Sequence, residues 1–226
     1  IADFKTIKYF NNKSIVKGFT TNPSLMRLAG AKNYKKYSLK ILKVCNKKPI
    51  SFEVFADEPK EMLKQAYKIN SWGKNIYVKI PVVNSKGVFM GSVIKELSDN
   101  GVKLNITAVY TFEQTKQIYK KLNKKSKSII SIFAGRMADK GKDPLPIFKK
   151  SISLTKKNKN IEILWASTRE IFNIYQANSL GCQIITVPHE ILKKFSYLDR
   201  DLEKFSLETV EGFYKDAVSA GFKIKI

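Results

Sequence analysis

Short apolar runs alternate with longer amphipathic segments from one end of the chain to the other. The short runs predict seven buried strands, at residues 15–20, 50–55, 76–80, 103–108, 128–132, 161–166 and 182–187. The segments between them have the spacing of amphipathic helices. At 59–72, for example, one apolar face is approximated by Met62, Leu63, Ala66, Tyr67 and Ile69. Such repeated strand and helix units are typical of an α/β protein with a parallel sheet.

The start of the chain decides which parallel architecture is expected. Residues 2–10 already have a helical pattern, with Phe4, Ile7 and Phe10 inward, so we expect one further strand immediately before Ile1. With that strand the chain would complete a TIM (β/α)8 barrel, whose first strand is missing from this sequence. An open doubly wound sheet is the alternative, which the lack of a glycine-rich turn after an early strand disfavours.

We expect residues 1–226 to form one barrel domain, with 207–221 as an appended C-terminal helix that packs on the barrel or on a neighbouring subunit. A chain of 226 residues with 43% hydrophobic content can bury one substantial core. No apolar run approaches the roughly 18 to 20 residues that span a bilayer, and no leader segment is recognisable, so we expect a soluble, cytoplasmic protein. The two cysteines match neither a disulfide framework nor a metal pair, and His189 is the only histidine, so no metal and no cofactor are expected.

The net charge of +23 first suggests a nucleic-acid-binding protein. The excess is nearly all lysine, 38 against 4 arginines, and it is scattered along the chain. Because bidentate recognition of bases and phosphates favours arginine, this composition indicates a solvated, lysine-rich surface rather than a nucleic-acid site. Some salt-sensitive attraction to polyanions is still expected.

Lys79 stands inside the short apolar run 75–81, where a solvated lysine is out of place. Burial lowers the pKa of an ammonium group, and the neutral amine can attack a carbonyl to form an imine. The alternative is a lysine at a strand end whose stem lies on apolar surface while its head reaches water.

Further polar residues recur where the predicted strands end, and the carboxyl ends of barrel strands surround one pocket. These residues are Asn22, Glu53, Lys79, Asn105, Thr107, Ser131, Arg136, Ser167 and Arg169. Most have a structural alternative: Asn22 precedes a proline, Thr107 is an ordinary strand residue, and the serines and arginines suit loops and surfaces. Glu53 is harder to explain in this way, because a carboxylate between apolar neighbours is costly to bury unless it is paired, protonated or used. Together the residues favour an active site around Lys79.

Five motifs resemble those of the transaldolase family in order and spacing: GFTTNPSL at 18–25, VKIP at 78–81, LNIT at 104–107, SIFAGR at 131–136 and ASTR at 166–169. The resemblance implies metal-free transfer of a dihydroxyacetone unit from a ketose phosphate (sedoheptulose 7-phosphate or fructose 6-phosphate) to an aldose phosphate (erythrose 4-phosphate or glyceraldehyde 3-phosphate). It further implies that Lys79 forms a Schiff base at the C2 carbonyl, while Glu53 and Thr107 hold the water that shuttles protons. Substrate-binding positions implied in the same way are Asn22, Asn105 and Ser131 for the three-carbon unit and Arg136, Ser167 and Arg169 for the phosphate. Phe133 is a further predicted substrate-binding position.

Two features of this resemblance leave alternatives open. The catalytic aspartate of the family's first strand would lie just before Ile1, and Asp3 is not its equivalent. The related fructose-6-phosphate aldolases, which are lyases, typically have glutamine at the position of Glu53 and tyrosine at that of Phe133, so both positions favour transaldolase.

The small chain and the C-terminal helix resemble the short subfamily, which contains both activities and forms rings of five or ten subunits, so we expect a homo-oligomer. A non-catalytic basic barrel that binds polyanions is the remote alternative.

Overall fold

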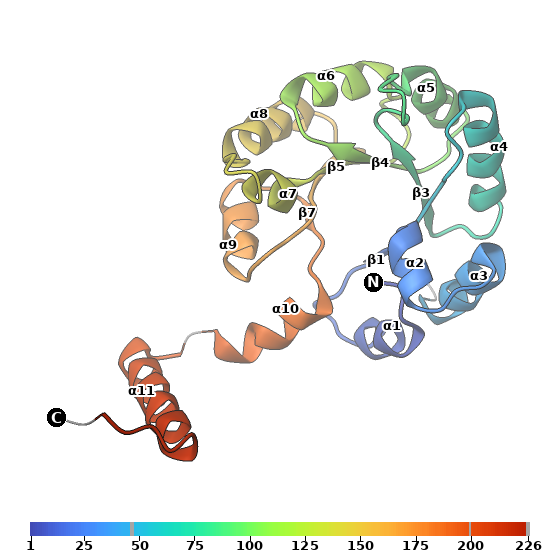
Figure 1. Ribbon diagram of the computed structural model, residues 1–226. Helices are drawn as coiled ribbons and strands as arrows, with labels where there is room; N and C mark the ends of the chain where they lie inside the picture. The colour runs from blue at the N-terminus through green and yellow to red at the C-terminus, as the bar shows by residue number, and fades with distance from the viewer. Residues whose placement is uncertain (46–47, 199, 225–226) are drawn as a thin grey trace.

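A parallel sheet with helices on its outside forms the centre of the computed structural model, which describes residues 1–45, 48–198 and 200–224 (Figure 1). Within these residues the sheet has seven strands in the order of the sequence, and every neighbouring pair is parallel. The strands are β1 (Phe19–Thr20), β2 (Ile50–Glu53), β3 (Ile76–Pro81), β4 (Leu104–Val109), β5 (Ser128–Ile132), β6 (Ile161–Trp165) and β7 (Ile184–Ile185). The sheet curls as in a TIM barrel, so the predicted fold class is confirmed.

Helices follow the strands and cover the convex side of the sheet (Figure 1). Their bounds are α1 (Phe4–Asn11), α2 (Pro23–Leu28), α3 (Tyr34–Cys45), α4 (Pro59–Asn70), α5 (Gly91–Asp99), α6 (Phe112–Lys121), α7 (Ala134–Ala138), α8 (Leu145–Thr155), α9 (Phe172–Ser179), α10 (His189–Lys193) and α11 (Leu202–Ser219), with a 3-10 turn at Lys194–Tyr197. Local sequence explains several ends. Thr111 and Gln114 form a capping box at the start of α6, and Gly101 takes a left-handed backbone just after α5.

Alternation of side chains along each strand divides the interior into two layers. The larger layer lies between sheet and helices and contains fully buried residues such as Ile80, Leu104 and Trp165. The inside of the curved sheet holds a much smaller apolar cluster, built on Ile129, Leu164 and Ala166. Most of the hydrophobic stabilisation therefore comes from the outer layer, and the inside of the sheet is left to other residues.

The two outermost strands, β1 and β7, are shorter than the sequence pattern predicts, since each has only two residues in the ladder. A strand is defined by its hydrogen-bonded neighbours, and among the described residues each of these strands pairs on one side only. The Thr20 carbonyl of β1 instead accepts a hydrogen bond from the nitrogen of Ile1 at 2.9 Å. The strand expected before Ile1 lies outside this sequence and stays a prediction.

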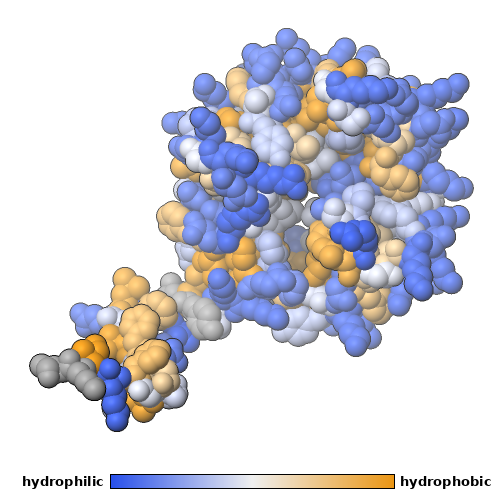
Figure 2. All heavy atoms as spheres, in the orientation of Figure 1, coloured by the Kyte–Doolittle hydropathy of each residue, from blue (hydrophilic) through white to orange (hydrophobic). Residues whose placement is uncertain are grey.

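The C-terminal helix begins earlier than predicted, at Leu202 rather than residue 207, because the Asp201 side chain caps it by accepting from the Lys204 backbone nitrogen. It buries none of its residues against the described part of the chain and lies apart from the barrel (Figure 1). Its exposed side chains include Leu202, Phe213 and Tyr214. Figure 2 shows this segment as an apolar area beside a barrel whose surface is largely hydrophilic.

Among the described residues, no helix is both long enough and apolar enough to span a membrane.

Candidate active site

Lys79 lies on β3 with only 7% of its surface exposed. Its Nζ is 3.0 Å from Glu53 Oε2 and donates a second hydrogen bond to the Thr21 carbonyl at 3.1 Å. The lysine head is thus held by protein groups inside the barrel mouth, which is the buried environment expected from the sequence rather than that of a strand-end lysine in open water.

Strand register places the acid beside the amine. Glu53 on β2 is the direct partner of Lys79, and Lys79 is in turn the partner of Asn105 on β4. Because partners in a parallel ladder point to the same face, one carboxylate, one amine and one amide form a row across three neighbouring strands.

A buried chain of hydrogen bonds crosses the same face. Asn105 donates through Nδ2 to Ser51 Oγ at 3.0 Å, and Ser131 donates to Asn105 Oδ1 at 2.6 Å. These side chains come from β2, β4 and β5, so the first bond passes over β3 on the inside of the curved sheet. All three side chains are buried, and the chain satisfies polar groups that would otherwise be costly to remove from water.

Thr107, two residues beyond Asn105, is 2% exposed, and its hydroxyl has no hydrogen-bond partner among the described residues. An unsatisfied buried hydroxyl costs about 1 to 3 kcal/mol, so such a group needs an explanation. Its position on the strand that carries Asn105 makes binding of a small polar species a physical reason for keeping it.

The two arginines predicted to bind phosphate are both exposed, but they differ in their contacts. Arg169 forks onto Asp139, with Nη2 2.6 Å from Oδ2 and Nε 3.0 Å from Oδ1. Hydrogen bonding to Arg169 lowers the pKa of the Asp139 carboxyl, and the same bond raises the pKa of Arg169. The Arg136 guanidinium instead lies over the Phe133 ring, 5.4 Å from its centroid.

Ser167, in the loop after β6, has an unusual backbone, with φ at 66°. A left-handed conformation is uncommon for a residue with a side chain and has to be held by its surroundings. Gly135 on α7 supplies that constraint, because a Cβ there would lie 1.6 Å from the Ser167 carbonyl oxygen. The loop after β6 and the turn after β5 are therefore packed backbone to backbone.

Asn22 has the structural role that the sequence left open. Its Oδ1 accepts a hydrogen bond from the Leu25 nitrogen at 2.7 Å and so caps α2, with Pro23 in the first helical turn. The cap fixes Asn22 directly after β1, at the same end of the sheet as Lys79.

Sequence reasoning missed three contributors to this region: Tyr34, Ser51 and Asp139. Ser51 could have been found, because it precedes Glu53 by two residues on the same strand face. Tyr34 and Asp139 reach the site from helix ends, where no periodic pattern reveals their partners.

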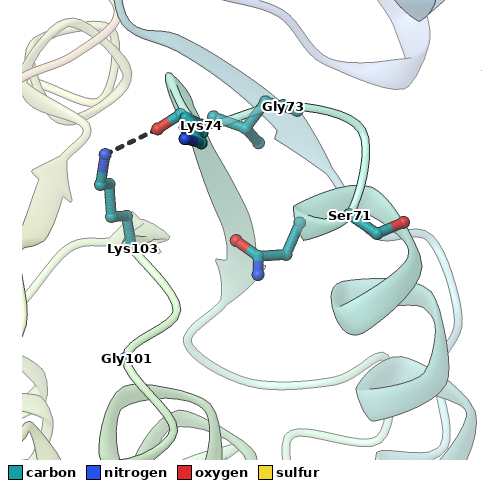
Figure 3. A pocket seen from close by; sticks show the side chains of 7 residues that line it. Ser71, Gly73, Lys74, Gly101 and Lys103 are labelled. Atoms are coloured by element: carbon teal, nitrogen blue, oxygen red, sulfur yellow. Dashed lines mark hydrogen bonds between the residues drawn. The ribbon is translucent and has the colours of Figure 1, made fainter.

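Figure 3 shows a cavity that belongs to the opposite end of the sheet. It is lined by Asn70, Ser71, Gly73, Lys74, Ile76, Gly101 and Lys103. Lys103 donates to the Lys74 carbonyl at 2.7 Å, which ties together the segments that enter β3 and β4. In a barrel the amino ends of strands serve stability, so this cavity is not part of the site. The described residues also hold no cluster of three or more His, Cys, Asp or Glu side chains suited to a metal ion.

Known proteins resemble this chain over most of its length. A family model described as Transaldolase/Fructose-6-phosphate aldolase matches residues 1–224. A relative from Dehalococcoides mccartyi, named a probable transaldolase, is 32% identical over 192 residues, which are 84% of this chain and 85% of the relative. A probable transaldolase from Clostridium kluyveri is 32% identical over 208 residues, 90% of this chain and 92% of the relative.

Solved structures share the fold at much lower identity. A mandelate oxidase variant with benzoyl-formic acid has a TM-score of 0.54 at 9% identity and is matched over 81% of this chain and 58% of that chain. A flavocytochrome b2 variant with sulfite bound has a TM-score of 0.55 at 13% identity, over 82% and 52%. This chain spans little more than half the length of either structure, and the likeness concerns the fold alone.

Replacing Gly135 with alanine should lower the free energy of unfolding by about 1 to 3 kcal/mol, the usual cost of overpacking, because the new methyl group meets the Ser167 carbonyl. Urea denaturation measures the effect. Gly212→Ala is the control, since a Cβ there meets nothing within 4 Å. An unchanged midpoint for Gly135→Ala would show that the contact with Ser167 is not a tight one.

Proposed function

The chain belongs to the transaldolase/fructose-6-phosphate aldolase family, and on this premise we propose that it transfers a dihydroxyacetone unit from a ketose phosphate to an aldose phosphate through a Schiff base on Lys79. The observation that carries the proposal is the buried Lys79 amine, 3.0 Å from the Glu53 carboxylate. An amine nucleophile with an acid–base group in hydrogen-bond reach is the arrangement that imine chemistry needs.

In the proposed reaction the neutral amine of Lys79 adds to the C2 carbonyl, and the carbinolamine loses water to give an iminium ion. Glu53, with a water held between it and Thr107, moves the protons of these steps. The Thr107 hydroxyl, which has no partner among the described residues, supports this role, because a bound water would satisfy it.

Removal of the proton from the C4 hydroxyl then breaks the bond between C3 and C4. The aldose phosphate leaves, and the electron pair of the broken bond stays on the three-carbon fragment as an enamine. In the second half-reaction this enamine attacks the acceptor aldehyde. By family resemblance the base at C4 is an aspartate of the family's first strand. We assign Asn22, Asn105 and Ser131 to the hydroxyl groups of the three-carbon unit; the buried bond between Asn105 and Ser131 holds those two side chains in place.

For the phosphate we assign Arg136, Ser167 and Arg169, with Phe133 packed beneath the first of these. Guanidinium forks suit phosphate oxygens. Since Arg169 is forked onto Asp139, the phosphate would share or replace that carboxylate as partner.

Dependence on an acceptor separates the proposed transferase from the alternative lyase. We expect release of an aldose phosphate from fructose 6-phosphate to be slow until a second aldose phosphate is added, because the enamine on Lys79 needs an electrophile. Steady release of free dihydroxyacetone without an acceptor would identify an aldolase instead. Tight, salt-dependent nucleic-acid binding without any imine would favour the remote polyanion-binding alternative.

Borohydride reduction in the presence of fructose 6-phosphate should attach a sugar fragment to Lys79, as read by peptide mass spectrometry. Lys79→Met should abolish the adduct, and Lys103→Met, at the other end of the sheet, should leave it unchanged. Glu53→Gln should slow trapping by about 100-fold, the size of a lost acid–base group. A three-carbon adduct reports cleavage and a six-carbon adduct reports imine formation without it; an unmodified Lys79 contradicts the proposal.

We also propose that α11 docks on a second copy of this chain. Several of its large apolar side chains are exposed, including Leu202 at 80%, Phe213 at 69% and Tyr214 at 71%. A helix that buries no residue against the described part of its own chain has little reason to be stable alone, because most helical stability comes from packing of an apolar face.

Light scattering after size-exclusion chromatography should show an oligomer that Phe213→Glu dissociates, because a charge in an apolar interface costs several kcal/mol. Lys204→Glu changes charge on a polar position of the same helix and should leave the mass unaltered. A monomeric parent protein would contradict the docking of α11 on a second copy.

A further inference from the structure

The backbone of Glu53 lies just beyond the last hydrogen bond between β1 and β2. This bond joins the Thr21 nitrogen to the Ser51 carbonyl. Peptide groups along a strand turn alternately to its two neighbours; the Val54 nitrogen bonds to the Lys79 carbonyl on β3, so the N–H and C=O of Glu53 face the β1 side. The chain has left β1 at that level to begin α2, and Glu53 therefore has no strand to pair with.

The hydroxyl of Tyr34 fills this place. It accepts a hydrogen bond from the Glu53 nitrogen at 3.0 Å and donates one to the Glu53 carbonyl at 2.9 Å. One phenol thus satisfies both backbone groups, which two residues of a longer β1 would have paired. Burial raises the pKa of Tyr34 to about 12, so the hydroxyl keeps the proton that it donates throughout the neutral range.

Tyr34 is itself held in place from two sides. It is the first residue of α3, and its ring packs edge to face on Phe55 at 5.4 Å and at a tilt near Trp72 at 6.2 Å. These contacts fix where the hydroxyl lies relative to β2. They depend on the ring alone, so phenylalanine would preserve them and lose only the two hydrogen bonds.

Glu53 is the last residue of β2, and its side chain is the partner of the Lys79 amine. A strand end without a neighbour frays, and a rotation of its backbone would carry the carboxylate away from Nζ. We propose that Tyr34 is a positioning residue, which holds the Glu53 carboxylate on Lys79 by closing the end of β2. Its effect on catalysis rests on the proposed function; its effect on the pair does not.

Tyr34→Phe tests this, with Tyr37→Phe as the matched control. Tyr37 is on the same helix, and its hydroxyl shares its one proton between the carbonyls of Ala2, at 3.1 Å, and Ala29, at 3.3 Å, instead of bonding to β2. Hydrogen exchange should show the Glu53 amide opening about tenfold faster in Tyr34→Phe only, the value of one lost hydrogen bond. Acetylation of Lys79 by acetic anhydride, which requires no substrate, should also become faster in that variant alone.

With fructose 6-phosphate, Tyr34→Phe should reduce kcat about tenfold and leave KM unchanged, since Tyr34 has no assigned contact with the sugar. In a Glu53→Gln background it should have no further effect on kcat, because both changes act through one carboxylate. Unchanged amide exchange or unchanged Lys79 acetylation in Tyr34→Phe would overturn the inference. If the parent protein forms no imine while both substrate-free measurements respond to Tyr34→Phe, the proposed function fails and the inference stands.

Discussion

The site depends on a largely buried pair of ionisable groups, Lys79 and Glu53, that has to be held in register. Removing an ammonium and a carboxylate from water costs several kcal/mol per ion, and their attraction offsets this only when the geometry is good. Three strands each supply one part: the Thr21 carbonyl follows β1, Glu53 ends β2, and Lys79 lies in β3. A slip of one residue in β2 or β3 would turn Glu53 or Lys79 toward the helices. The parallel ladder therefore keeps the two groups together.

The same constraint explains why polar groups occupy so much of the inside of the sheet. The apolar layer between sheet and helices is large and closely packed, so it can stabilise the fold without help from the barrel interior. The interior can then hold the hydrogen bonds that link Ser51, Asn105 and Ser131. Both bonds restrict Asn105, the neighbour of Lys79. Thr107 is the exception on this face: its hydroxyl has no partner among the described residues, which is why the proposed function gives it a bound water.

Much of this arrangement could be predicted from the sequence, because it follows from periodicity. The alternation of Asn105 and Thr107 with apolar residues predicted that both lie on one face. The apolar residues around Lys79 indicated that it is buried. Other features depend on contacts that no local pattern contains. The two-residue length of β1 depends on where its neighbours end, and the early start of α11 depends on a cap at Asp201. Tyr34 meets Glu53 across 19 positions of sequence, and a helical pattern around it says nothing of that meeting.

Charge at the proposed phosphate-binding positions acts differently from charge at Lys79. The many lysines raise the electrostatic potential around the protein and so attract anions without selecting among them. Selection requires a fixed fork, and Arg169 has its fork already engaged by Asp139, with both side chains about half exposed. An arriving anion must then compete with a carboxylate of single charge. A phosphate, which carries nearly two charges near neutral pH and three acceptor oxygens, competes better than a neutral hydroxyl or another carboxylate can. In the proposed function Asp139 would therefore lower the affinity for every ligand, but least for a phosphorylated one.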